Sequence, residues 1–237
     1  MDISVVIPVY NEGRKIDMDI RMAAQFMEMN KISGEIIISD DGSTDDTLDI
    51  PESLFQKTSI PIRILDNKNH YGKGYAVRSG IIQAEGKIIL FIDSGACVYY
   101  EDILPGIELI KTEACGIVHG SRFMPGSFIT RKKQWYRQLL SYSFRKFLQS
   151  WVKVPFNLTD TQCGLKIYER AIAQELYQKC ITRGFMFDIE IILRAEKAGY
   201  TIKEFPITWA ADLDSRLLIS KTFFEMMREL RKIKKVI

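Results

Sequence analysis

Two adjacent carboxylates, Asp40 and Asp41, begin the segment 40–45, which reads DDGSTD. The segment follows a short apolar run and precedes a helical pattern, so a turn whose hydroxyl groups cap a helix would explain part of it. Two neighbouring carboxylates exceed what such a turn requires. A carboxylate at this position can accept the ring N–H of a uracil or guanine base, which makes the segment a candidate for nucleotide recognition.

A lysine between two glycines, Lys73, opens a later helical pattern in the segment 72–74 (GKG). The spacing is not the dinucleotide fingerprint, because Val77 stands where the third glycine is required, and it is not a phosphate-binding P-loop. A flexible helix start explains the segment as well as a function does. The functional interpretation places backbone N–H groups and Lys73 near the ribose or the phosphates of a nucleotide.

A third acidic position, Asp93, ends an apolar run over residues 87–92 and is followed by Ser94 and Gly95. A carboxylate at the end of a buried strand is costly unless it has a partner. That partner is either a helix N-terminus or backbone amide or, in a functional site, a sugar hydroxyl or a divalent ion.

The elements that position these residues follow from the hydrophobic pattern of the first half. Short apolar runs alternate with amphipathic stretches, which predicts a mainly parallel sheet covered by helices on both faces. Ligands bind at the carboxyl ends of the strands in such sheets, and the polar motifs lie at these ends. The predicted strands are 3–7, 35–38, 60–65, 87–92 and 116–119, and the predicted helices are 14–29, 44–55, 73–84 and 101–112.

The second half has a different organisation, with a long helical pattern over residues 131–154. No repeat, linker or low-complexity segment interrupts the chain, so we expect one domain over residues 1–237. Its nucleotide-sugar half would span 1–120 and its acceptor half 121–237. Strands are also predicted at 165–168 and 201–205, and helices at 187–198 and 221–235.

Taken together, these motifs resemble family 2 inverting glycosyltransferases over roughly residues 3–220. The segments 5–12 (VVIPVYNE), 40–45 and 72–74, with Asp93, match the nucleotide-sugar half of the family in order and spacing. The resemblance implies a single-domain, Rossmann-like GT-A fold with a mainly parallel mixed sheet. The segments 120–123 (GSRF), 160–166 (DTQCGLK) and 187–190 (FDIE) are similar to the subgroup that contains the dolichyl-phosphate glucosyltransferases and mannosyltransferases.

The resemblance also implies roles for individual residues. Asp160 takes the catalytic-carboxylate position, with Asp93 beside it, and Arg122 and Arg131 face the phosphates of the donor or the acceptor. The implied nucleotide-sugar site consists of Pro8, Tyr10, Glu12, Asp40, Asp41, Lys73, Asp93 and Ser94.

The implied metal site departs from the family pattern. Asp93 corresponds to the first carboxylate of the DXD motif, which holds Mg²⁺ or Mn²⁺, but Gly95 replaces the second carboxylate and the next ligand-capable residue is Cys97. Because Mg²⁺ is bound mainly through carboxylates and substrate phosphates, we expect a weakened site formed by Asp93 and the diphosphate. The alternatives are that cationic side chains replace the ion or that catalysis is lost.

The type of acceptor can be inferred from the basic residues. An alcohol needs a general base to remove its proton, whereas a phosphate monoester, with a second pKa of about 6, is already anionic near neutral pH. The excess of cations therefore favours a polyprenyl or dolichyl phosphate acceptor. The glucosyltransferase-like segment 160–166 makes UDP-glucose the first choice of donor, ahead of GDP-sugars. The candidate phosphate-binding cations are Lys73, Arg122, Arg131, Lys132 and Lys133.

The segment 131–154 resembles a helix that lies on a membrane surface. It holds seven Lys or Arg and no Asp or Glu, with aromatic residues along one face. Basic amphipathic helices of this type bind at membrane interfaces, although an apolar stripe also forms core or homodimer contacts. The apolar face consists of Tyr136, Leu140, Phe144, Phe147 and Trp151, and the basic C-terminal residues Arg228, Arg231, Lys232, Lys234 and Lys235 would add attraction to anionic lipid.

Composition excludes some of the other classes of function. A formal charge of +3 over 237 residues is too small for a nucleic-acid-binding protein. The four cysteines have no metal-ligand spacing, and neither a signal peptide nor a spanning apolar run is recognisable, so we expect a cytoplasmic protein at the membrane periphery. Two other functions stay open: a soluble glycosyltransferase acting on a saccharide or protein hydroxyl, and a nucleotide-sugar-binding protein without turnover.

Overall fold

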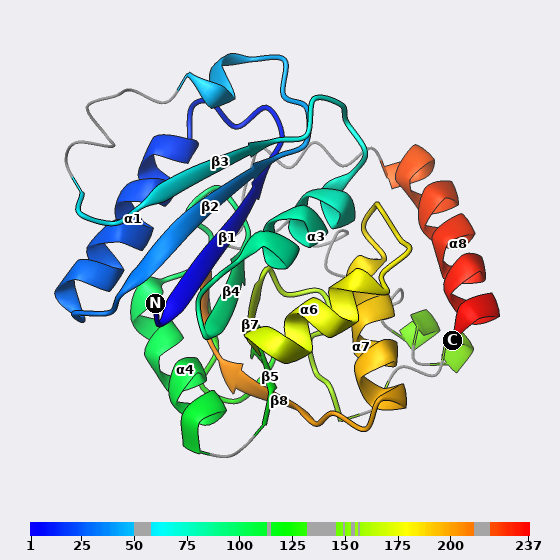
Figure 1. Ribbon diagram of the computed structural model, residues 1–237. Coiled ribbons are helices and arrows are strands. Elements are labelled where there is room, and N and C mark those ends of the chain that lie inside the picture. The colour runs from blue at the N-terminus through cyan, green and yellow to red at the C-terminus, as the bar shows by residue number, and fades with distance from the viewer. Residues whose placement is uncertain are drawn as a thin grey trace.

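A seven-stranded sheet forms the centre of the computed structural model (Figure 1). The structure describes residues 1–49, 58–112, 115–131, 146–148, 150–152, 155, 157–210 and 219–237. In order across the sheet, the strands are β3 (Ile62–Asp66), β2 (Gly34–Asp40), β1 (Ile3–Val9), β4 (Ile88–Ile92), β7 (Leu165–Glu169), β5 (Ile117–Ser121) and β8 (Ile202–Pro206).

One strand of this sheet runs against the others. Strand β7 is antiparallel to both β4 and β5, while the remaining pairs are parallel. The first residue of β7, Leu165, therefore pairs with Ile92 at the end of β4. The sheet is mixed and mainly parallel, as predicted. A separate parallel pair is formed by β6 (Phe128–Arg131) and β9 (Thr208–Ala210).

Because side chains alternate along each strand, the sheet has a hydrophobic core on each of its two faces. In β1, Val5 and Ile7 belong to the core on one face of the sheet, whereas Val6 belongs to the core on the other. Likewise Leu90 and Phe91 of β4 point to opposite faces. Strands that are buried on both faces read as continuous apolar runs, which is why the sequence indicates them clearly.

Helices cover both faces of the sheet. Helices α1 (Ile16–Met29) and α4 (Ile103–Thr112) pack on one face, and α3 (Lys73–Gln83), α6 (Arg170–Gln178) and α7 (Phe187–Lys197) pack on the other (Figure 1). Helices α1, α3 and α4 each follow a parallel strand, whereas α6 follows the antiparallel strand β7 and α7 follows α6. The strand ends and helix starts that carry the polar motifs are therefore brought to one edge.

The last helix, α8 (Ile219–Val236), lies outside α7 and holds a loop of the site edge in place. Its Leu230 and Ile233 share a core cluster with α7. The carboxylate of Glu229 accepts the backbone N–H groups of Gly184 at 2.6 Å and Met186 at 3.1 Å. Among the described helices, none combines the length and the apolar character needed to cross a membrane.

Most of the predicted elements are confirmed, with two kinds of exception. The predicted helix 44–55 is wrong in its described part, where residues 44–49 contain only the 3₁₀ turn η1 (Asp46–Leu48). Asp45 accepts the backbone N–H of Thr47 at 3.0 Å and so caps the start of this short turn. Helix α6 and the pair β6 and β9 were not predicted, although the buried Ala173, Leu176 and Tyr177 of α6 have helical spacing.

The predicted interface helix 131–154 lies largely outside the described residues. Residues 146–148 and 150–151 are helical, and there the rings of Phe147 and Trp151 stack with centroids 5.4 Å apart. Both side chains are partly buried against the cluster that joins α7 and α8. At this end of the segment, the apolar face therefore packs against the protein and not against a membrane.

Candidate active site

The carboxyl ends of β1, β2, β4 and β5 meet the start of β7 at one edge of the sheet. The antiparallel direction of β7 brings the loop before it, residues 160–164, beside Asp93 at the end of β4. The backbone N–H of Asp93 donates to the carbonyl oxygen of Gly164 at 2.8 Å. Motifs that are far apart in the sequence thus become neighbours because of strand order and direction.

The two adjacent carboxylates at the end of β2 are both buried and already bonded. Asp40 accepts the backbone N–H groups of Gly42 and Ser43, each at 2.9 Å, and the hydroxyl group of Ser43. Asp41 accepts the backbone N–H groups of Tyr71 at 2.9 Å and Gly72 at 2.9 Å. These bonds shape the loops on either side of the strand end. A direct bond from either carboxylate to a nucleobase stays a prediction.

Two exposed rings lie beside Asp41. His70 and Tyr10 stack with centroids 4.0 Å apart and 25° between their planes, and His70 Nδ1 lies 2.9 Å from Asp41 Oδ2. Burial raises the pKa of Asp41 above its ordinary value, against the opposing effects of its N–H donors and His70. The pair offers an aromatic surface at the edge where a base is expected. The sequence argument identified Tyr10 and missed His70.

The loop after β1 supports this surface. Pro8 is buried within β1, so it positions Tyr10 and does not itself reach the surface. Glu12 is half-buried, its backbone N–H donates to Thr47 Oγ1 at 2.8 Å, and its carboxylate lies 3.3 Å from Lys15 Nζ. The structure therefore places Tyr10 and Glu12 near the end of β2, as predicted.

An ion pair between Lys73 and Asp93 joins the start of α3 to the end of β4. Lys73 Nζ lies 2.6 Å from Asp93 Oδ1. Burial by itself lowers the pKa of Lys73, but the charge and hydrogen bond of Asp93, with the charge of Asp188, together outweigh burial, so the pKa is raised and the amine stays protonated. Gly164 leaves room for this pair, because a Cβ there would lie 2.2 Å from the Asp93 carboxylate. Ser94, which follows, is half-buried.

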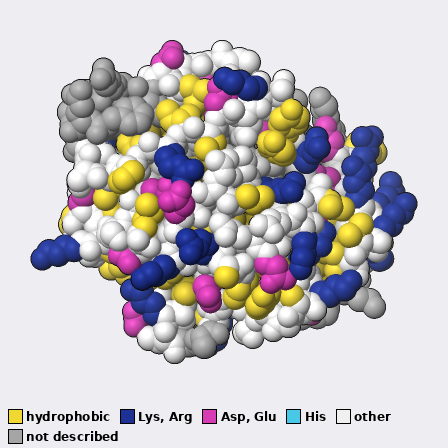
Figure 2. Space-filling model, in the orientation of Figure 1, with side chains coloured by type: hydrophobic (Ala, Val, Ile, Leu, Met, Phe, Trp, Pro, Cys, Tyr) yellow, Lys and Arg dark blue, Asp and Glu magenta, His cyan; other side chains and the backbone are white. Residues whose placement is uncertain are grey.

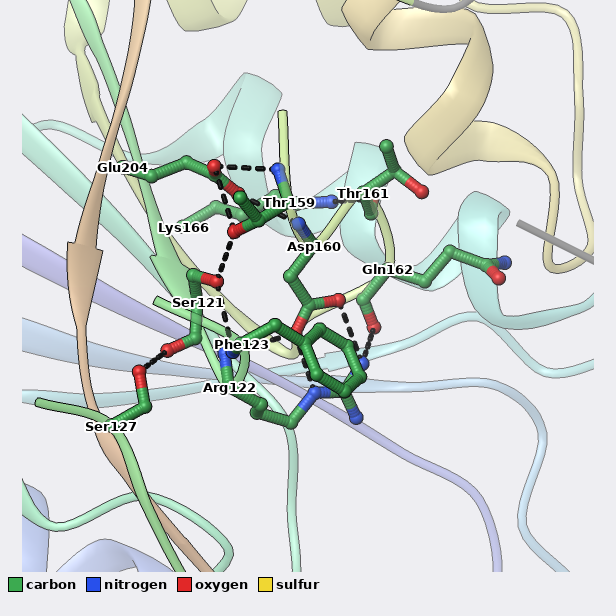
Figure 3. Close-up of polar contacts among 10 residues, drawn as sticks. All are labelled: Ser121, Arg122, Phe123, Ser127, Thr159, Asp160, Thr161, Gln162, Lys166 and Glu204. Atoms are coloured by element: carbon green, nitrogen blue, oxygen red, sulfur yellow. Dashed lines mark hydrogen bonds and ion pairs between the residues drawn. The ribbon is translucent and has the colours of Figure 1, made fainter. Parts of the chain in front are cut away.

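Asp160 and Arg122 form a second, buried ion pair (Figure 3). Arg122 Nε and Nη2 donate to the two carboxylate oxygens at 2.6 and 2.9 Å, and the backbone N–H of Arg122 donates at 3.1 Å. Burial by itself would raise the pKa of Asp160, but the charge and hydrogen bonds of Arg122, with the charge of Lys166, together outweigh burial and hold the pKa below its usual range. Asp160 is therefore ionised, bonded on both oxygens and a poor proton acceptor.

A network around this pair fixes its position. Glu204 of β8 accepts the backbone N–H groups of Thr159 at 2.7 Å and Asp160 at 2.8 Å, and the hydroxyl groups of Ser121 and Thr159 lie 2.6 Å apart (Figure 3). The loop that carries Asp160 is thus tied to the ends of β5 and β8. Sequence reasoning missed Glu204, which carries no local signal because its partners are more than forty residues away.

A third pair, between Lys166 of β7 and Asp188 of α7, lies behind the first two. The ammonium group of Lys166 donates to Asp188 and, at 3.2 Å, to the carbonyl oxygen of Thr161. Burial raises the pKa of Asp188, and Lys166 and Lys73 oppose the shift. The nearby Glu190 is fully buried and accepts the backbone N–H groups of the loop at Ile181 and Thr182, so it supports the fold.

The turn that replaces the second acidic position has an unusual backbone. Gly95 has a φ of 93° and Ala96 a φ of 51°, and their N–H groups donate to the buried carboxylate of Asp19 in α1. Cys97 is buried, with its thiol directed to the carbonyl oxygens of Ser94 and Gly95. It offers no additional outward ligand.

These residues do not by themselves form a site for Mg²⁺ or Mn²⁺. In the described part of the chain, no three His, Cys, Asp or Glu side chains converge as a metal-binding group would require. Asp93, the predicted ligand, directs Oδ1 at the ammonium of Lys73. Since Mg²⁺ needs about six oxygen ligands, the described residues at this edge supply too few of them.

Of the predicted phosphate-binding residues, the structure places Lys73 and Arg122 and does not describe the side chains of the others. Arg131 is the last residue of β6, and the structure describes its backbone only. Lys132 and Lys133 lie outside the described residues.

Comparison with known proteins agrees with this geometry. A sequence model described as Glycosyl transferase family 2 matches residues 4–177. The chain belongs to this family. It is 32% identical over 243 residues to a dolichyl-phosphate beta-glucosyltransferase of Dictyostelium discoideum, covering 98% of this chain and 73% of that protein. It is 31% identical to the dolichyl-phosphate beta-glucosyltransferase of Saccharomyces cerevisiae, covering 96% and 72%.

Solved structures show the same fold. The family 2 chain superimposes on glucosyl-3-phosphoglycerate synthase from Mycobacterium tuberculosis in complex with Mn²⁺, UDP and phosphoglyceric acid, with a TM-score of 0.72, 18% identity and coverage of 98% of this chain and 77% of that one. A complex of that protein with Mg²⁺ and UDP gives the same TM-score. The predicted GT-A fold and glycosyltransferase family are thereby confirmed.

We predict that restoring a carboxylate with Gly95→Asp will destabilise the protein. A side chain at a φ of 93° is strained by about 1–2 kcal/mol, so the thermal midpoint should fall by several degrees. Thermal unfolding with and without Mn²⁺ measures the effect, and Ser94→Asp in the same turn is the control without this backbone strain. A Gly95→Asp protein as stable as the wild type would contradict the prediction.

Proposed function

We propose that this glycosyltransferase transfers a sugar, with glucose as the first choice, from a UDP-sugar to the phosphate of a polyprenyl or dolichyl lipid. The transfer would invert the anomeric configuration and take place at a membrane surface. The chain is 32% and 31% identical in sequence to two dolichyl-phosphate beta-glucosyltransferases over nearly its whole length. This similarity supports a lipid phosphate as the acceptor and glucose as the sugar.

The observation that carries the proposal is the bidentate pair between Arg122 and Asp160. An alcohol acceptor needs a general base, but the pKa of Asp160 is held below its usual range and both of its oxygens are bonded to Arg122. A phosphate acceptor carries its own negative charge and needs no proton removed. The pair therefore favours a lipid phosphate over a saccharide or protein hydroxyl.

In the proposed reaction, a phosphate oxygen of the acceptor attacks the anomeric carbon from the side opposite the leaving group. The new C–O bond forms as the bond to the β-phosphate of UDP breaks, and UDP departs with the electron pair. No proton has to move. The protein holds the two anions in line and offsets their repulsion, for which positive charge at Lys73 and Arg122 is suited.

The predicted residues divide into two groups in this proposal. Tyr10, with His70 beside it, and the loops shaped by Asp40 and Asp41 would bind the base and ribose. Lys73 and Asp93 would lie at the diphosphate and sugar. Glu12 and Ser94 fill the edge between these groups, and Asp160 would act by positioning Arg122.

A divalent ion, when bound, would offset charge on the diphosphate, and its use by this chain stays a prediction. The solved structures of glucosyl-3-phosphoglycerate synthase include complexes with Mn²⁺ or Mg²⁺ together with UDP. Here Asp93 is the available carboxylate, so the other ligands would have to come from the diphosphate. No step above depends on the ion.

The experiment that tests the proposal incubates the protein with radiolabelled UDP-glucose and polyprenyl phosphate, followed by organic extraction. Label in the organic phase is expected, and omission of the lipid or use of polyprenol in place of its phosphate should abolish it. Parallel reactions with Mg²⁺, Mn²⁺ or a chelator decide the metal requirement. Transfer only to water-soluble acceptors would contradict the lipid phosphate, and UDP binding without any transfer would indicate a non-catalytic protein.

We predict that Asp160→Asn retains measurable turnover, whereas Asp160→Ala loses more. The amide keeps the shape and one acceptor oxygen for Arg122 but cannot act as a base. Steady-state turnover with the lipid phosphate, beside UDP affinity as a binding control, measures the difference. Complete loss of turnover in Asp160→Asn with UDP affinity intact would favour a hydroxyl acceptor.

The C-terminal helix supports attachment to an anionic membrane surface, at the cytoplasmic face expected from the sequence. Its outer side is basic and Figure 2 shows Lys and Arg side chains gathered along the edge where α8 lies. Near the start of the helix, Phe223 and Phe224 are 47% and 75% exposed. Exposed aromatic and basic side chains together are typical of interfacial helices. The exposed cations of α8 are Arg228, Arg231, Lys232, Lys234 and Lys235.

We predict that the protein floats with liposomes containing anionic lipid and does so less at high salt, because salt screens exposed charges. Replacing both Phe223 and Phe224 with Ser should reduce recovery further. The control is Met18→Ser, which removes an equally exposed apolar side chain, 57% exposed, from α1. Wild-type protein that stays in the soluble fraction at low salt would contradict membrane attachment.

A further inference from the structure

The turn that follows Asp93 has a backbone that needs external support. Gly95 and the non-glycine residue Ala96 are consecutive and both have positive φ, at 93° and 51°. A side chain in the left-handed region costs about 1–2 kcal/mol, so a turn of this kind persists where its surroundings hold it. Both N–H groups of this turn point toward the first turn of α1.

Both N–H groups are received by one carboxylate, that of Asp19. Asp19 Oδ2 accepts from Gly95 at 2.9 Å and Asp19 Oδ1 accepts from Ala96 at 2.8 Å. Asp19 stands on the buried face of α1, between Ile16 and Ala23, and is 4% exposed. A carboxylate in an otherwise apolar stripe is costly to bury, so its place there indicates a specific role.

The effect of this contact reaches Asp93 through the chain. The N–H of Asp93 is bonded to Gly164 on one side, and the turn two residues later is bonded to Asp19 on the other. The backbone at Asp93 is thus held from β7 and from α1 at once. Its carboxylate has little freedom, since Gly164 borders it and Lys73 lies 2.6 Å away.

We propose that Asp19 is a positioning residue of the donor site, which holds the turn 94–96 so that Asp93 and Lys73 stay aligned for the diphosphate. The inference rests on the proposed function, because it assigns the Lys73–Asp93 pair to the diphosphate of the donor. It adds a residue outside the family motifs, in the first turn of α1. The base-binding surface at Tyr10 and His70 is held by other contacts and does not depend on Asp19.

Because Asp19 would affect the diphosphate part of the site and not the base-binding surface, the affinity for UDP relative to uridine tests its role. Uridine keeps the base and ribose but lacks the diphosphate. In Asp19→Ala the advantage of UDP over uridine should fall about tenfold, while uridine affinity stays within about twofold of the wild type. The preference of Asp19→Asn for UDP should lie between those of the wild type and Asp19→Ala, because its single carbonyl oxygen can accept one of the two N–H groups.

Calorimetric titration of the full chain with UDP and with uridine measures these affinities. The matched control is Asp17→Ala, which removes an exposed carboxylate from the same turn of α1, where it pairs with Arg21. An unchanged ratio in both Asp19 variants overturns the inference, and so does an equal loss for uridine and UDP, which would indicate a purely structural role. If Asp19→Ala does not fold, Asp19→Asn decides by the same ratio.

The same titration separates this inference from the proposed function. Wild-type protein that binds neither UDP nor uridine overturns the proposed function and the inference with it. Wild-type protein that prefers UDP, together with Asp19 variants of unchanged preference, overturns the inference alone.

Discussion

Each carboxylate at the edge of this sheet faces a cation or a set of N–H donors, which offsets the cost of removing it from water. Removing a carboxylate from water costs several kcal/mol, and breaking a buried pair by deleting one partner costs about 3–5 kcal/mol. Asp160 has Arg122, Asp93 has Lys73 and Asp188 has Lys166. This requirement for a partner determines which oxygens are available for chemistry and which are already occupied.

The carboxylates at the end of β2 and those near the ends of β4 and β5 have different kinds of partner. At the end of β2, the carboxylates of Asp40 and Asp41 are bonded mainly to backbone N–H groups, which fixes the loops and leaves the rings of Tyr10 and His70 exposed. At the ends of β4 and β5, side-chain cations take this role. Cationic groups, each paired with a carboxylate, thus lie where two phosphate-bearing substrates are proposed to meet. A site arranged in this way is better suited to bringing anions together than to removing a proton.

The antiparallel strand β7 makes this arrangement possible. It enters between β4 and β5, so that the segment 160–166 begins at the same edge where the parallel strands end. Gly164 then meets Asp93, and Lys166 points back toward α7. Helix α8 adds a further tie through Glu229, which holds the loop before α7. The donor side of the site is therefore connected to the outermost helix of the molecule.

Much of this could be predicted from local pattern. Continuous apolar runs indicated the strands of the sheet, and the polar residues directly after them included Tyr10, Asp40, Asp41 and Asp93. Lys73 was identified at a helix start, and the role of Arg122 was implied by the family resemblance. Local pattern failed where the partner is distant in sequence, as it is for Glu204. It also predicted a helix from residue 44, where the described residues 44–49 contain only the 3₁₀ turn Asp46–Leu48, capped by Asp45.

The sequence by itself determined which groups reach the edge of the sheet, because side-chain alternation and strand–helix order depend on neighbours in the chain. It also contained a signal that was overlooked, since Asp19 interrupts the apolar stripe of α1. Only the tertiary structure decided how these groups pair: Asp160 with Arg122, Asp93 with Lys73, and Asp19 with the turn at Gly95. The physical reason is that the pKa and availability of a buried charge depend on what surrounds it in space, and strand order sets those surroundings.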